Sequence, residues 1–238
     1  MKITLLIFYI LALSCGNTYK TNEKFANLSD VSNSLSNDTI APIIIKEKLI
    51  NYSAERIKLS LEYLKERHGI IQSVPNIQPK IIVLHYTAGG TINSIFSYFN
   101  NTLIENSREF NSKQSRLNVS AHYLVDRNGD IYHLVEDTLF ARHTIGLNYC
   151  AIGIENIGSK ENPLTNMQVK SNVKLINYLC YKYKIEYLIG HSEYDCFRKS
   201  SLWKESNPNY FTGKEDPGDI FLKDIRKNIK DLKLKYKP

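Results

Sequence analysis

Hydrophobic residues along the chain predict an alternation of buried strands and amphipathic helices. Continuous apolar runs are typical of strands buried on both faces, and they occur at 80–86, 151–156 and 187–191. Apolar positions at helical spacing, among them Ile57 and Met167, predict helices over 53–68, 92–99, 165–183 and 220–234. Strands at 119–125 and 130–135 flank an Asn-Gly hairpin turn. Hairpin and crossover connections together predict a single α/β domain with a central mixed β-sheet flanked by helices.

The first residues have the pattern of an export signal. Lys2 precedes an apolar run of 11 residues, 3–13, which is too short for the roughly 20 residues of a membrane-spanning helix. Ala12-Leu13-Ser14-Cys15-Gly16 follows, and it resembles a bacterial lipobox in which Cys15 is lipidated. We therefore expect a signal peptide at 1–14, a lipidated N-terminus with a flexible polar tether at 15–39, and the folded domain at 40–238. An ordinary signal peptide that happens to contain a cysteine is the alternative.

Composition narrows the class of protein only slightly. The chain is 42% hydrophobic and 23% charged, as globular proteins are, and its net charge of +7 suits an anionic partner or simply a lysine-rich surface. The basic residues are dispersed and the protein is predicted to be exported, so we expect no nucleic-acid partner. Beyond Cys15 there are Cys150, Cys180 and Cys196, which allow one disulfide and one free thiol without selecting the pair.

Two histidines stand at the ends of predicted strands, which suggests metal binding. His85 ends the run 80–86 and His191 ends the run 187–191. Imidazole and carboxylate are ligands that Zn²⁺ prefers, and Asp216 is a further candidate because Pro217 and Gly218 place it in a turn. Taken singly, each of these residues is a weak signal.

Five segments in one order carry a family resemblance. They are Leu84-His85-Tyr86-Thr87-Ala88-Gly89, Ser120-Ala121-His122-Tyr123-Leu124-Val125, Ile152-Gly153-Ile154-Glu155-Asn156, Gly190-His191-Ser192-Glu193 and Lys214-Glu215-Asp216-Pro217-Gly218. Over roughly residues 80–221 the chain resembles the type 2 N-acetylmuramoyl-L-alanine amidases, which are related to phage lysozyme-like amidases and peptidoglycan recognition proteins. The resemblance implies that His85, His191 and Asp216 bind one Zn²⁺ ion.

The same resemblance implies roles for three other residues. Glu155 matches the acidic residue that orients or deprotonates the attacking water, and Lys214 matches the lysine that stabilises the developing oxyanion. His143 matches a histidine that lines the substrate cleft, so we expect it to bind substrate. His122 matches a mainly structural position.

The sequence departs from the family pattern at three places. Ala121 occupies the position of a catalytic tyrosine in phage-type members, so proton transfer is expected to rest on Glu155. Arg142 replaces the usual tryptophan before the histidine of the cleft. The segment 194–212 is longer than in compact members, and Arg198-Lys199 could be the displaced match to a Gly-Arg-Lys run. Its aromatic residues Trp203, Tyr210 and Phe211 could form either a wall for sugar or peptide, or part of the core.

These observations lead to one functional hypothesis with two rivals. We expect a zinc amidase, a monomer, that acts on peptidoglycan or muropeptides outside the cytoplasm and is held on a bacterial membrane by an N-terminal lipid. A non-catalytic peptidoglycan-recognition module is the first rival, although all three metal-ligand positions are filled. A zinc hydrolase acting on proteins is the second, and the chain contains no HExxH motif.

Overall fold

The computed structural model describes residues 43–238. The predicted signal peptide 1–14, the lipidation site Cys15 and the tether 15–39 lie outside the described residues. Within the described part, no helix has the length and apolar character needed to cross a membrane. Cys150, Cys180 and Cys196 are free thiols, so the disulfide that the sequence allowed is not formed among them.

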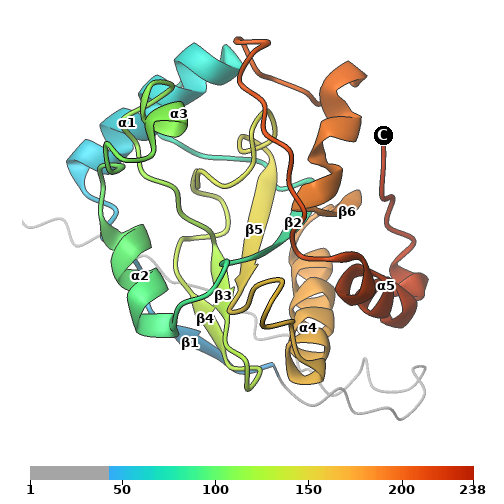
Figure 1. Ribbon diagram of the computed structural model, residues 1–238. Helices are drawn as coiled ribbons and strands as arrows, with labels where there is room; N and C mark the ends of the chain where they lie inside the picture. The colour runs from blue at the N-terminus through green and yellow to red at the C-terminus, as the bar shows by residue number, and fades with distance from the viewer. Residues whose placement is uncertain (1–42) are drawn as a thin grey trace, which may run out of the picture. The chain divides into compact units, whose positions relative to one another are not determined.

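A mixed sheet of six strands forms the centre of the domain (Figure 1). In spatial order the strands are β1 (Ile45–Glu47), β4 (Ile131–His133), β3 (Tyr123–Val125), β5 (Ala151–Asn156), β2 (Ile81–Tyr86) and β6 (Tyr187–Gly190). The β3–β4 pair is antiparallel, and every other neighbouring pair is parallel. This arrangement confirms the predicted α/β domain with a mixed sheet.

Helices cover the sheet and also flank its edges. They are α1 (Ala54–His68), α2 (Ile92–Asn100), α3 (Glu109–Ser112), α4 (Asn166–Lys182) and α5 (Asp219–Asn228), with the 3₁₀ helices η1 (His191–Lys199) and η2 (Lys230–Leu232). Capping residues fix where α1 and α4 begin. The Ser53 hydroxyl accepts from the backbone of Arg56, and Thr165 forms a reciprocal capping box with Gln168.

Side chains alternate between the two faces of the central strands, and each face packs against its own apolar cluster. Ile82 and Leu84 of β2 pack with α4 and α5, which lie side by side over one face of the sheet (Figure 1). Ile81 and Val83 point to the opposite face, where the segment after β6 packs. Because side chains alternate along a strand, His85 lies on the face of Ile81 and Val83. The pleat therefore directs His85 away from the α4–α5 layer.

Several predicted boundaries are wrong, as are two of the residues predicted for the buried sides of helices. The strand predicted at 119–125 is ordered as a strand only over β3, and the helix predicted to residue 234 ends at Asn228. Ile57 and Met167 are 36% and 50% exposed, because α1 buries its Leu59–Tyr63–Leu64 side and α4 buries the side of Leu175 and Leu179. The short elements β1, α3 and η1 were not predicted from the sequence.

The long segment 194–212 belongs mainly to the core. Tyr194 and Tyr210 are buried, Phe211 stacks on the Tyr194 ring, and Trp203 packs against the same apolar cluster. Of the two alternatives for its aromatic residues, core packing is therefore the one observed for most of the segment. Tyr210 also reaches the wall of the pocket described below.

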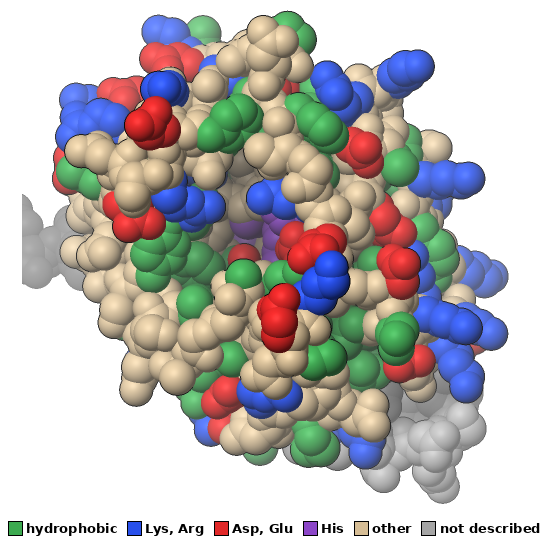
Figure 2. All heavy atoms as spheres, viewed as in Figure 1, with side chains coloured by type: hydrophobic (Ala, Val, Ile, Leu, Met, Phe, Trp, Pro, Cys, Tyr) green, Lys and Arg blue, Asp and Glu red, His purple; other side chains and the backbone are tan. Residues whose placement is uncertain are grey.

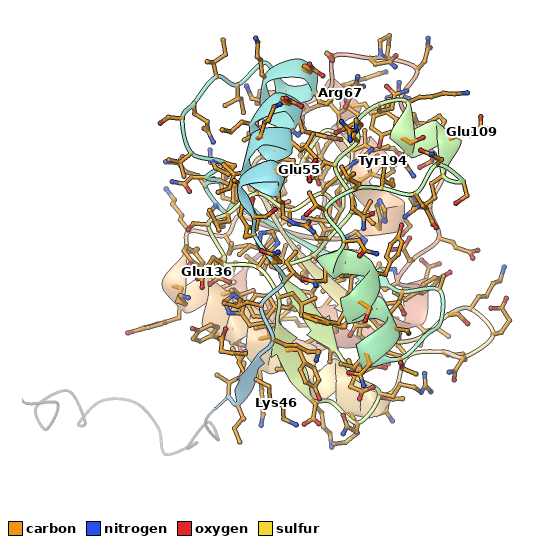
Figure 3. All side chains as sticks on the ribbon, turned by 90° about the vertical axis from the view of Figure 1, so that its left-hand side faces the viewer. Lys46, Glu55, Arg67, Glu109, Glu136 and Tyr194 are labelled. Atoms are coloured by element: carbon orange, nitrogen blue, oxygen red, sulfur yellow. The ribbon has the colours of Figure 1, made fainter. Side chains whose placement is uncertain are left out.

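This segment is fastened to the C-terminal end of α1. Arg67, which lies near that end (Figure 3), forms an ion pair with Glu205, and its carbonyl accepts from Ser206 N at 3.0 Å. The neighbouring His68 is 5% exposed, and its Nδ1 contacts the carbonyl of Lys204. Burial lowers the pKa of His68 to about 4, so this imidazole is neutral at pH 7.

The depressed pKa of His68 predicts a loss of stability in acid. Below about pH 6.5 the unfolded imidazole binds a proton, whereas the folded one stays neutral until about pH 4. The free energy of unfolding should therefore fall by up to about 3 kcal/mol between pH 6.5 and 4 on account of this residue. His68→Asn keeps a donor for Lys204 and removes the titration. Urea unfolding at a series of pH values should show that the free energy of unfolding falls more steeply for the wild type than for the variant between pH 6.5 and 4. An equal fall in both proteins would contradict the prediction.

Candidate functional site

The carboxyl ends of three parallel strands bring the predicted site residues together. In the register of β2 and β5, His85 is directly opposite Glu155, and Leu84 is opposite Gly190 in β6. His191 is the next residue after Gly190, so it lies beside His85. Parallel strands end at one edge of a sheet, which is why residues distant in sequence meet here.

Asp216 reaches this edge from the loop that precedes α5. A Cβ atom on Gly190 would lie 2.6 Å from Leu222 Cδ1 and 2.9 Å from Pro217 Cδ, so only glycine lets the loop approach β6 this closely. The backbone of Ser192 donates to the Asp216 carbonyl at 2.9 Å. Both contacts hold the aspartate next to His191.

Three ligand atoms converge on one point. His85 Nδ1 lies 3.0 Å from His191 Nδ1, and Asp216 Oδ2 lies 3.3 Å and 3.2 Å from these two nitrogens. A tetrahedral metal with bonds of about 2.0–2.1 Å has ligand atoms about 3.3 Å apart, so the triangle has the size of one face of such a site. All three side chains are buried, and they could hold a metal ion. The sequence analysis predicted this set.

The charge states of His191 and Asp216 also suit a metal. Burial lowers the pKa of His191 to about 4, and the neighbouring His85 adds to the shift, so His191 is neutral at pH 7. Burial alone would raise the pKa of Asp216, but contacts with His191 and His85 hold it well below its usual range. Neutral imidazoles with one carboxylate form the nitrogen and oxygen donor set of many zinc sites.

His143 supports His85 from behind. Its Nε2 lies 3.1 Å from the carbonyl of Ala151, to which it donates, so its Nδ1 is left as an acceptor. That Nδ1 lies 3.1 Å from His85 Nε2 and 2.8 Å from Thr144 Oγ1. His85 therefore donates through Nε2, which leaves the lone pair of its Nδ1 directed into the space between Asp216 and His191, where a metal ion would bind. Such outer contacts fix the orientation of a ligating histidine.

Glu155 is the acidic group beside the ligand triangle. Its Oε2 is buried and has no hydrogen-bond partner among residues 43–238. Burial raises the pKa of Glu155 to about 7, the charge of Asp216 adds to the rise, and His85, Lys214 and Arg108 oppose it. A carboxyl group with this pKa can both accept and return a proton near neutrality.

An open pocket of about 280 Å³ joins these groups. Figure 2 shows imidazole rings at the bottom of a hollow with basic side chains at its rim. His85, His143, Glu155, Lys214 and Asp216 all line it, as predicted. The exposed Lys214 stands at the edge next to the ligands.

Some other residues near the pocket were predicted from the sequence, and others were not. His122 has both ring nitrogens in backbone contacts, with Gly153 N and Leu139 O, which agrees with its expected structural role. Ala121 is fully buried. Tyr98 and Arg108 also line the pocket. Neither was indicated by the sequence, because Tyr98 is one of several aromatic residues of a predicted helix and Arg108 lies in a segment with no motif.

Matches among solved structures include two amidases and one PGRP. The N-acetylmuramoyl-L-alanine amidase LysC from Clostridium intestinale is 20% identical, with a TM-score of 0.50, over 82% of this chain and 100% of that chain. Bumblebee PGRP-SA is 16% identical, with a TM-score of 0.48, over 83% and 100%. The amidase AmiD from E. coli, in complex with a muropeptide substrate, is 20% identical, with a TM-score of 0.44, over 63% and 57%. At these identities, the LysC match shows the fold alone.

Sequence comparison identifies the family. Curated protein sequences give no match to this chain. The family model described as N-acetylmuramoyl-L-alanine amidase matches residues 75–219, which include every predicted metal ligand and catalytic residue. Because this match covers more than half of the chain, the protein belongs to the N-acetylmuramoyl-L-alanine amidase family, as its sequence motifs indicated.

Proposed function

We propose that this protein is a zinc-dependent peptidoglycan hydrolase. It cleaves the amide bond between the lactyl group of N-acetylmuramic acid and the L-alanine of the stem peptide. The observation that carries the proposal is the convergence of His85, His191 and Asp216 within 3.0–3.3 Å, beside Glu155 in one pocket. Family membership supplies the bond that is cut.

The roles of the side chains follow from their positions. His85, His191 and Asp216 would hold the zinc ion, which when bound supplies Lewis acidity toward the scissile carbonyl and favours ionisation of water near pH 7. Glu155 accepts a proton from the attacking water and delivers it to the amine of the departing alanine. Lys214 places a positive charge at the pocket edge, where the carbonyl oxygen becomes negative.

The N-terminal sequence pattern supports a proposal for where the protein acts. We propose that the chain is exported and anchored to a bacterial membrane through lipidated Cys15, and that it acts as a monomer on wall polymer or its fragments. The net charge of +7 favours contact with this anionic material.

A digest of purified peptidoglycan with the full chain tests the proposal. With zinc added, mass spectrometry should detect free stem peptides that begin with alanine, and a chelator should abolish them. Zinc bound in stoichiometric amount and tight wall binding without any release of peptide would contradict the enzyme hypothesis. That result would instead favour a recognition module.

A further inference from the structure

Arg108 is a basic residue of the pocket that the proposed chemistry does not use. It lies in the segment between α2 and α3, and its side chain lines the same pocket as Glu155 and Lys214. Its Nη1 donates to Tyr98 Oη at 2.6 Å, and its Cζ lies 5.9 Å from the centre of the Tyr98 ring. No carboxylate of residues 43–238 lies within 4.0 Å of its guanidinium.

The other arginine of the pocket, Arg142, already donates its hydrogen bonds to groups of the protein. Arg142 is 3% exposed, and its two terminal nitrogens donate to the carbonyls of Ser115, Leu117 and Asn111 and to Tyr210 Oη. It ties the 111–117 segment to the long segment 194–212. Arg108 instead has donors left over and a half-buried position, which together leave it able to bind an anion in the pocket.

The surroundings hold Arg108 ready for such a ligand. Tyr98 lies in α2, and its carbonyl accepts from Asn118 Nδ2 at 2.7 Å, so the residue that orients the guanidinium is itself fixed. A guanidinium fixed in this way loses little side-chain entropy when it pairs with a carboxylate, and its fork of donors matches the two oxygens.

We propose that Arg108 is a specificity-determining residue that binds a carboxylate of the stem peptide. The inference rests on the proposed function, because it takes the stem peptide as the ligand. The carboxylate that follows the cleaved alanine most closely is the α-carboxylate of the glutamate that is linked through its side chain. In some walls this group is a carboxamide, which is uncharged and cannot form the ion pair. Arg108 therefore selects the free acid.

Two matched substrates test the inference: N-acetylmuramoyl-L-alanyl-γ-D-glutamyl-L-lysinamide, whose single carboxylate is the glutamate α-carboxylate, and the same compound with that group as a carboxamide. The wild-type protein should favour the free acid roughly 10- to 100-fold, mainly through a lower KM, as expected for a hydrogen-bonded charged group. Arg108→Gln should raise the KM for the acid to that for the amide and leave the zinc content unchanged. Arg108→Lys keeps the charge without the fork and should retain part of the preference.

Arg116 provides the matched control. It lies just beyond α3, eight residues after Arg108, carries the same charge, is exposed, and does not line the pocket. Arg116→Gln should leave the preference between the two substrates intact. A merely structural role for Arg108 would alter the rates for both substrates alike and would not erase their ratio.

The outcomes separate the subsite from the reaction. Equal KM values for the two substrates in the wild type, or a preference that survives Arg108→Gln, would overturn the inference even with amidase activity established. If neither compound is cleaved, the proposed function fails, and calorimetric titration of both compounds tests the subsite alone. Tighter binding of the free acid by the wild type, lost in Arg108→Gln, would support it, and equal binding would overturn it.

Discussion

Glu155→Gln should lower kcat for release of stem peptides by about 10²- to 10⁴-fold, the usual contribution of a positioned general base or acid. Glutamine has nearly the same shape but cannot accept the proton of the attacking water or carry it to the amine. Glu155 pairs with His85 in the sheet register, and its buried Oε2 has no hydrogen-bond partner among the described residues. Rates on a defined muropeptide, followed by mass spectrometry, provide the measurement.

Glu161→Gln is the control for this substitution. Glu161 is an exposed acid soon after β5, bonded to Ser159 Oγ at 3.0 Å, and it does not line the pocket. Its variant should keep wild-type rates. Zinc content and substrate binding should be normal in Glu155→Gln as well, since the residue does not belong to the ligand triangle. A Glu155→Gln protein with full zinc and nearly wild-type kcat would assign the proton transfer to another group.

The sequence predicts the centre of the fold better than its margins. Strands β2, β5 and β6 are continuous apolar runs buried on both faces, and such runs have few other possible structures. The edge strand β1 and the helix α3 have three and four residues, which is too short for a periodic pattern to appear. The buried sides of α1 and α4 contain most of the residues predicted for them, but Ile57 and Met167 are apolar residues that lie outside the buried stripe.

The sequence predicted which residues form the site, but not how their side chains contact one another. Motif order indicated His85, His191, Asp216, Glu155, Lys214 and His143, and all six line one pocket. No sequence pattern indicated that His143 Nδ1 faces His85 Nε2, because that contact depends on how the loop after residue 141 crosses the sheet. Arg108 was not predictable either, since a single arginine in an irregular polar segment becomes informative only when tertiary structure places it in the pocket.

Asp216→Ala should weaken zinc binding by more than about 100-fold and abolish amide hydrolysis. Loss of a residue that only supports a ligand typically costs 10- to 100-fold in metal affinity, so loss of a ligand itself should cost more. The substitution removes the only carboxylate of the triangle and leaves two imidazoles with their Nδ1 atoms 3.0 Å apart. Competition with a chromophoric chelator gives the zinc affinity independently of any assay of activity.

Glu215→Ala is a stringent control because it removes the adjacent carboxylate in the same loop. The Glu215 oxygens face away from the triangle, toward Tyr86 Oη at 2.9 Å and Lys160 Nζ at 3.4 Å, and the residue is exposed. If general negative charge near the pocket attracted the metal, both variants would lose affinity to a similar extent. The proposed site requires that Asp216→Ala alone loses stoichiometric zinc, since only its Oδ2 lies within 3.3 Å of both histidine nitrogens. Wild-type zinc affinity in Asp216→Ala would show that the ion is held elsewhere.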